Sequence, residues 1–185
     1  MPILCAEQAV FPEYLLDEPW QESLGRSWVV IWTKSRQEKA LARELMSWEV
    51  PFFFPTVPKE NYIRGKVVHS HLPLFPGYLF VCGTDDERVT SLKTNRVVRV
   101  LPVIDQEQLR LDLVQIRDLI ASGAPLTIEQ RMGPGRRVRV RSGPLAGLEG
   151  TVVCRRGECR IIVAVNFLQQ GASVAIEDFM LEPND

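Results

Sequence analysis

A Pro-Gly pair near the middle of the chain limits most strongly how the chain can fold. It lies in the stretch HLPLFPGYLFVC, residues 71–82. A Pro-Gly pair stops a helix and forces a turn, so the chain should leave Gly77 as a β-strand. Side chains alternate across a strand, which places Tyr78 and Phe80 together on one face. Such a strand is either buried on both faces, or it presents these two aromatic rings to solvent or to a partner.

Two further runs predict a strand followed by a helix. The run WVVIWTK, residues 28–34, is rich in β-branched and aromatic residues and predicts a strand. The residues Ser35 to Glu38 match the S-x-x-E capping box, which opens a helix. Leu41, Leu45 and Trp48 recur at helical spacing and should form the buried stripe of that helix.

The order of the elements that follow predicts an α+β fold for the first domain. PFFFP is a short extended element, NYIRGKVVH a hairpin turning at Arg64-Gly65, DDERVTSLK a short helix and RVVRVL a strand. The resulting order, β-α-β, a hairpin, then β-α-β, indicates a ferredoxin-like antiparallel sheet with both helices on one face. The opposite face would be open, which favours exposure of Tyr78 and Phe80.

The second half of the chain predicts a separate small β domain. An amphipathic helix follows Asp105, and Gly123 can end it. After a Gly- and Pro-rich segment come short Val- and Ile-rich runs separated by glycine turns, a pattern typical of a small antiparallel barrel. β-Branched residues favour strands over helices in these runs. We therefore expect an acidic, flexible extension (1–26), an N-terminal domain (27–122), a linker (123–135) and a β-barrel domain (136–185).

The charge distribution suggests an anionic partner. The chain has 22 basic and 23 acidic residues, but residues 27–104 carry 11 bases against 7 acids. No run is long and apolar enough to cross a membrane, and the first twenty or so residues make a poor signal peptide. We therefore expect a cytoplasmic protein without a membrane partner.

Neither a metal site nor a catalytic site is predicted. The four cysteines should be reduced thiols in the cytoplasm, although Cys154 and Cys159 flank a turn and can face each other across a hairpin. The two histidines, His69 and His71, do not combine with the cysteines into a zinc-ligand spacing. No nucleophile, phosphate-binding or paired-carboxylate motif is present. We expect a protein that is not an enzyme and holds no cofactor.

Two segments together resemble a known family. WVVIWTKSRQEKALARELMSWEV with PLFPGYLFV downstream resembles the N-terminal domain of the NusG family of transcription elongation factors. RRVRVRSGPLAGLEGTVV resembles a KOW motif, the signature of the C-terminal SH3-like barrel of that family. KENYIRGKVVHSHLPLFPGYLFV, with its basic hairpin, is more similar to specialised RfaH-like paralogues than to the general factor.

The resemblance implies a contact with RNA polymerase. In this family, the equivalent aromatic surface binds the clamp helices of the largest catalytic subunit. By position, the residues of that surface would be Trp32, Phe75, Pro76, Tyr78 and Phe80. Rigid aromatic anchors on an open sheet face suit recognition of a helix. Phe75 has a second interpretation, as a core residue that covers the sheet edge.

The resemblance also implies a contact with nucleic acid. In the specialised paralogues, the region around the first helix touches the displaced non-template DNA strand. The corresponding residues here are Lys34, Arg36, Gln37, Lys39, Arg43, Asn95 and Arg96. Basic side chains would fix phosphates, and Gln and Asn could hydrogen-bond base edges. The alternative is an ordinary solvated helix face.

The KOW-like segment carries a loop and a second candidate surface. Its glycines suit turns or close approach of the backbone, and its leucines would pack the loop onto the barrel. These loop residues are Gly143, Leu145, Gly147, Leu148 and Gly150. At the end of CRIIVAVNF, one of Phe167 and Leu168 should point outward. In the family, this region binds a small-subunit ribosomal protein or the termination factor Rho.

The function indicated is that of a monomeric elongation and antitermination factor, tied to particular operons. It would bind polymerase through the first domain, suppress pausing or termination, and recruit a partner through the second. The alternative from a different class is a ribosome-associated or RNA-binding KOW protein that never meets polymerase.

Overall fold

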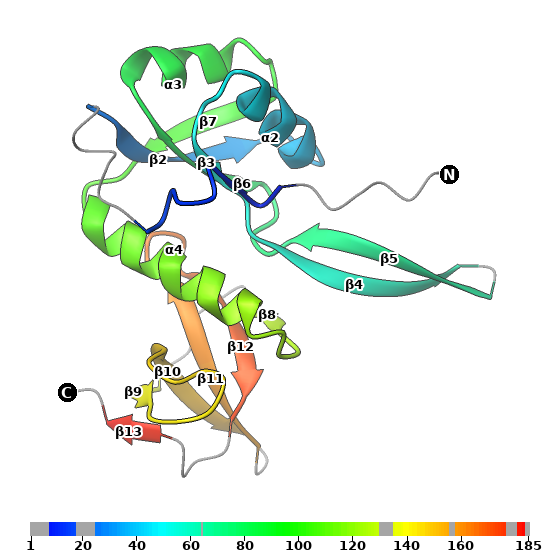
Figure 1. Cartoon of the computed structure of the whole chain (residues 1–185), viewed down its shortest axis with the longest axis vertical. Helices are drawn as coiled ribbons and strands as arrows, with labels where there is room; N and C mark the ends of the chain where they lie inside the picture. The colour runs from blue at the N-terminus through cyan, green and yellow to red at the C-terminus, as the bar shows by residue number, and fades with distance from the viewer. Residues whose placement is uncertain are drawn as a thin grey trace. The chain divides into compact units, whose positions relative to one another are not determined.

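The described residues form two compact units. The computed structural model describes residues 8–17, 25–63, 65–129, 135–155, 158–176 and 181–183. The chain divides into Met1–Gln106 and Glu107–Asp185 (Figure 1). Expectations for residues 1–7, 18–24 and 130–134, in the N-terminal extension and the linker, lie outside the described residues. The expected domain limits remain a prediction.

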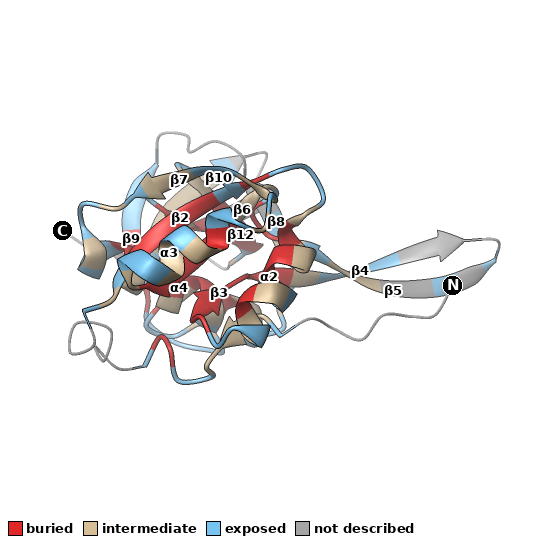
Figure 2. Ribbon diagram, turned by 90° about the horizontal axis from the view of Figure 1, so that it is seen from above, coloured by how far each residue is buried: buried red, intermediate tan, exposed pale blue. Residues whose placement is uncertain are grey.

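The described residues of the first unit form a five-stranded antiparallel sheet. Its strand order is β1-β3-β6-β2-β7, so β2 lies between β6 and β7. The strands are β1 (Val10–Phe11), β3 (Phe52–Phe53), β6 (Tyr78–Gly83), β2 (Ser27–Thr33) and β7 (Val97–Pro102). Figure 2 shows β2 and β3 as largely buried strands.

Two helices cover one face of this sheet, as the element order predicts. They are α2 (Glu38–Ser47) and α3 (Asp85–Leu92), and Figures 1 and 2 show them on the same side of the sheet. Leu41 and Leu45 of α2 are fully buried against Ile31, Leu79 and Val81 of the sheet. The helical spacing of the leucines and the alternation along β6 thus both lead into one core.

The expected capping box at the start of α2 is wrong. The helix begins at Glu38, and its N-cap residue, Gln37, makes no side-chain cap bond. The Glu38 carboxylate instead accepts a hydrogen bond from the Gly77 backbone N–H at 2.8 Å. A capping box does form at α3, where Thr84 and Glu87 satisfy each other's backbone N–H groups.

The expected exposure of Phe80 is also wrong. Phe80 is fully buried, and the Phe75 ring packs edge-on against it with centroids 5.9 Å apart. The ring centroid of Phe53, on the neighbouring strand, lies 6.3 Å from that of Phe80. The turn folds Phe75 back over β6, so the face opposite α2 is covered at this point. Tyr78, two residues earlier, is half-buried.

Part of the N-terminal extension belongs to the sheet. β1 pairs with β3 through Val10 opposite Phe53 and Phe11 opposite Phe52. Leu15 and Leu16 are buried as well. The expectation of a flexible extension is therefore wrong for these residues, because their apolar side chains have a place in the core.

A long hairpin follows β3. Among the described strands, β4 (Thr56–Ile63) and β5 (Lys66–Pro73) pair only with each other, and they project away from the five-stranded sheet (Figure 1). Ile63 lies opposite Lys66, and Gly65 adopts a φ of +75°, as expected for a turn at this glycine.

The described residues of the second unit form six antiparallel strands in the order β13-β9-β10-β11-β12-β8. They are β8 (Thr127–Glu129), β9 (Arg136–Val140), β10 (Glu149–Arg155), β11 (Glu158–Val165), β12 (Gln170–Ala175) and β13 (Leu181–Pro183). The expected strands of the second half are therefore present, whereas closure into a KOW barrel remains a prediction. The predicted amphipathic helix is α4 (Gln106–Ala121), with Leu109, Leu113 and Ile116 buried.

The expectation of reduced cysteines is wrong for Cys154. The register of β10 and β11 places Cys154 opposite Cys159, and Cys154 is disulfide-bonded. Directly opposed residues on antiparallel strands lie close together, which suits a cross-strand bond. The side chain of Cys159 lies outside the described residues. Cys82 is a free, buried thiol.

We expect Phe80→Ala to lower the free energy of unfolding by about 3–5 kcal/mol, because truncating a buried ring leaves a cavity. Val98→Thr is the matched control in a neighbouring part of the sheet, since Val98 is 52% exposed. It should change stability by less than about 0.5 kcal/mol. Urea denaturation followed by circular dichroism measures both. An unchanged midpoint for Phe80→Ala would contradict the burial.

We expect the contribution of Glu87 to stability to depend on pH. Burial raises the pKa of Glu87, but hydrogen bonds from Arg26 and the Thr84 backbone outweigh this and leave the pKa below its ordinary value of 4.5. A carboxyl whose pKa is lowered on folding stabilises the fold above that value and loses this effect as the pH falls. The stability difference between wild type and Glu87→Gln should therefore shrink in acid.

Urea titrations at neutral and acidic pH measure this difference. Asp86→Asn, on the same turn, is the control, because Asp86 is exposed and makes no ion pair among the described residues. A difference for Glu87→Gln that stays constant from neutral to acidic pH would contradict the prediction.

Candidate functional site

Three side chains from neighbouring strands lie abreast on the sheet face opposite α2. In the register, Trp32 of β2 lies opposite Tyr78 of β6 on one side and opposite Arg99 of β7 on the other. Trp32 is 45% exposed, Arg99 is exposed and Tyr78 is half-buried. We refer to Tyr78, Trp32 and Arg99 as the cross-strand row. It offers two aromatic rings and a guanidinium group on one surface.

The turn before β6 packs against Trp32 of the cross-strand row. Gly77 has a φ of +85°, and a Cβ atom built there would lie 3.5 Å from Cδ1 and Nε1 of Trp32. The indole therefore lies against this turn. Both backbone polar groups of Gly77 are hydrogen-bonded. Its N–H donates to the Glu38 carboxylate and its carbonyl accepts from the Thr33 N–H, each at 2.8 Å. Such anchoring restricts the position of Trp32.

The expected aromatic surface is therefore divided between surface and core. Pro76 is exposed at the turn, directly before Gly77, and it is Gly77 that lies against Trp32. Phe75 and Phe80 lie in the core behind them. Burial does not test a role in binding, but it leaves these two rings as support for the surface.

A second cluster forms where the end of β2 meets the loop before β7. The Lys34 N–H donates to the Arg96 carbonyl at 2.8 Å, which ties the two segments together. The Lys34 ammonium donates to Asn95 Oδ1, also at 2.8 Å. Arg36 is exposed, and both Arg36 and Asn95 have positive φ angles, of 61° and 57°. The structure thus brings Lys34 and Asn95 together, with the exposed Arg36 two residues after Lys34 in the chain. We refer to these three residues as the Lys34–Asn95 cluster.

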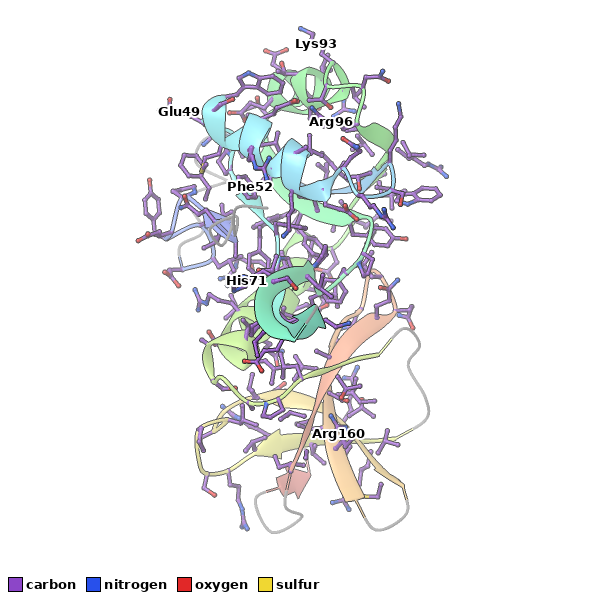
Figure 3. The ribbon with its side chains drawn as sticks, turned by 90° about the vertical axis from the view of Figure 1, so that its right-hand side faces the viewer. Glu49, Phe52, His71, Lys93, Arg96 and Arg160 are labelled. Atoms are coloured by element: carbon purple, nitrogen blue, oxygen red, sulfur yellow. The ribbon has the colours of Figure 1, made fainter. Side chains whose placement is uncertain are left out.

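The other expected nucleic-acid residues are placed differently. Arg96 forms an ion pair with Glu44 at 2.9 Å and donates to the Gln37 side chain, beside α2 (Figure 3). These contacts hold the loop onto the helix. Lys39 is half-buried and Arg43 exposed, further along α2. Their role in binding remains a prediction.

The glycine-rich loop of the second unit has the expected turn geometry. Gly143 and Gly147 have φ angles of +86° and +89°. Val140 and Leu148 are joined across the loop by a backbone hydrogen bond of 2.9 Å. A Cβ atom at Gly150 would lie 2.5 Å from the Ile162 carbonyl oxygen, so the backbones approach closely here. Leu148 is buried and Leu145 half-buried.

The turn after β11 presents Phe167. Phe167 is 38% exposed, whereas Leu168 is half-buried. The turn is anchored by Asp112, a buried residue of α4, whose carboxylate accepts a hydrogen bond from the Asn166 N–H at 2.8 Å. The sequence indicated Phe167 and Leu168 but not this anchor. Binding of a partner to either residue remains a prediction.

A protein-family model described as NusG, transcription termination factor nusG, matches residues 26–119, just over half of the 185-residue chain. The chain belongs to the NusG family. A search of curated proteins found no match. The matched range contains the whole cross-strand row and the Lys34–Asn95 cluster. It also extends through most of α4.

Membership in the NusG family implies a role in transcription elongation and binding to RNA polymerase. Factors of this family are not enzymes. Burial raises the pKa of Cys82 to about 12, so this thiol is protonated at neutral pH and a poor nucleophile. Among the described residues, no helix could span a membrane, and no three potential metal ligands cluster.

Sequence reasoning missed two residues of this NusG-family domain, the exposed Arg99 and the buried Glu38. Arg99 interrupts the run VVRVL and could have been noticed as a charge in a Val-rich strand. Its position beside Trp32 depends on the register, which the sequence does not reveal. Glu38 was assigned to a helix cap, whereas it holds the Gly77 turn. A buried acid can have several nearby N–H donors, and local sequence does not distinguish them.

Proposed function

We propose that this NusG-family chain is an elongation and antitermination factor that binds the clamp helices of the largest catalytic subunit of RNA polymerase. Trp32, Pro76 and Tyr78 form the contact surface. Phe75 and Phe80 support it from within the core. Binding there would let the factor bridge the clamp and oppose pausing or termination.

The exposed Trp32 is the observation that carries this proposal. A tryptophan that is 45% exposed on a sheet face, beside a tyrosine and against the Gly77 turn, is costly to leave in water. Trp and Tyr are also the residues most enriched among binding hot spots, because they bury much area at little entropic cost. The anchoring of Gly77 by Glu38 and Thr33 adds pre-organisation, which favours affinity.

The Lys34–Asn95 cluster supports a contact with the displaced non-template DNA strand. Lys34 and Arg36 would fix phosphates, while Asn95 offers an amide to a base edge. Arg96 and Gln37 position this loop through their contacts with α2, and Lys39 and Arg43 extend the basic surface along the helix. A factor with such a contact would be specialised for particular operons, in the manner of RfaH-like paralogues.

The second unit supports recruitment of a further partner. We propose that its strands form a KOW barrel, in which the glycine-rich loop is architectural. Phe167, with Leu168 beside it, would bind a small-subunit ribosomal protein or Rho. The factor would act as a monomer in the cytoplasm. The alternative function is that of a ribosome-associated protein that never binds polymerase. The following binding test distinguishes the two functions.

Trp32→Ala and Tyr78→Ala should each weaken binding of the full-length chain to core RNA polymerase, since hot-spot aromatics contribute about 2 kcal/mol or more. Biolayer interferometry with purified polymerase measures the affinity. Trp48→Ala is the matched control, because Trp48 is 42% exposed at the end of α2 and lies outside the row.

Circular dichroism establishes that each variant is folded. Equal affinities for wild type, Trp32→Ala and Tyr78→Ala would refute the proposed surface. Binding of the wild type to ribosomal subunits but not to polymerase would favour the other class of function.

The affinity for single-stranded DNA should fall with rising salt, because phosphate contacts release bound counterions. In the double variant Lys34→Ala, Arg36→Ala, the slope of log affinity against log salt should become shallower, by up to about 0.7 for each phosphate that the variant no longer binds. Fluorescence anisotropy with a labelled oligonucleotide measures both slopes. Lys93→Ala is a control on an exposed lysine at the end of α3. An unchanged slope in the double variant would refute the proposed contact with DNA.

A further inference from the structure

Arg99 is an exposed cation at the edge of the first sheet. Its side chain makes no hydrogen bond or ion pair among the described residues. Two other arginines of this unit are paired, since Arg26 bonds Glu87 and Arg96 bonds Glu44. β7 is an edge strand, so among the described strands none follows Arg99 in the sheet. A guanidinium group in this position is available for a carboxylate from outside.

The register fixes how far Arg99 lies from the aromatic anchors. Tyr78, Trp32 and Arg99 occupy three adjacent strands in direct register. Neighbouring strands are about 4.8 Å apart, so Tyr78 and Arg99 are separated by about 10 Å at the backbone. A helix rises about 1.5 Å per residue, so two helical turns, or about seven residues, span about the same distance.

We propose that Arg99 is a specificity-determining residue of the polymerase-binding surface and pairs with a carboxylate on the bound helix. The helix runs along the row, across the strands. Apolar side chains about one turn apart contact Tyr78 and Trp32, and an Asp or Glu about two turns from the first of them meets Arg99. This inference rests on the proposed function, because it defines the chemistry of the helix that the same surface binds.

The composition of the row favours a protein helix over a nucleic acid. Single-stranded nucleic acids bind along grooves with several cations beside the stacking rings. The row has one cation, at its end, and the rest of its surface is aromatic. Arginine also suits a carboxylate better than lysine would, because its planar group can donate two parallel hydrogen bonds.

Charge reversal at Arg99 tests the proposal in the full-length chain. Arg99→Glu should weaken binding to core RNA polymerase by about tenfold or more at low salt, because it sets two like charges against each other. Arg99→Gln should have a smaller effect, and Arg99→Lys should retain part of the affinity. The loss should diminish at high salt, where charges are screened. Arg136→Glu, an exposed arginine of β9, is the charge-matched control and should bind like wild type.

The outcomes separate this inference from the proposed function. If Trp32→Ala weakens binding and Arg99→Glu does not, Arg99 has no part and the proposed surface stands. If the wild type fails to bind polymerase, both fall. A loss in Arg99→Glu of affinity for a labelled oligothymidine, with polymerase binding intact, would assign the row to nucleic acid and overturn the proposal. Should Arg99→Glu be unfolded by circular dichroism, equal binding of Arg99→Gln and wild type would overturn it.

Discussion

The pairing of β2 with strands on both sides determines the first unit. β2 is held by β6 and by β7 in antiparallel register over most of its length. Because side chains alternate, this register sends Val29 and Ile31 toward α2 and turns Trp32 to the opposite face. A shift by one residue would exchange core and surface. The buried aliphatic residues therefore specify the position of the exposed tryptophan.

The Gly77 turn links the buried core of this sheet to the exposed cross-strand row. Its N–H is held by Glu38 of α2 and its carbonyl by Thr33 of β2, so helix, strand and turn are fixed relative to one another. Both Glu38 and Thr33 are buried, where a hydrogen bond is costly to leave unmade. The same turn lies against the indole of Trp32 and positions Phe75 so that it packs on Phe80. Contacts in the core therefore fix the position of the side chains in the cross-strand row.

Local patterns in the sequence predicted the elements, while their tertiary contacts required the structure. The apolar run of β2 and the leucine spacing of α2 were sufficient to place a strand and a helix. The burial of Phe80 was not predictable, because alternation gives a side chain's face and not what covers that face. Likewise, the capping signature was compatible with Glu38, but a buried donor at Gly77 competed for its carboxylate. Arg99 was missed because its position beside Trp32 depends on the strand register, which the sequence does not reveal.

The central claim is that Trp32 contacts the polymerase clamp helices. Placing a photoreactive benzophenone amino acid at position 32 of the full-length chain, and irradiating its mixture with transcription complexes, tests this contact directly. The account predicts a cross-link to the clamp helices of the largest subunit, mapped by mass spectrometry. The same group in place of Val89, which is 45% exposed on α3, should give none at that site. Cross-links from position 32 to DNA alone, or to another subunit, would contradict the account.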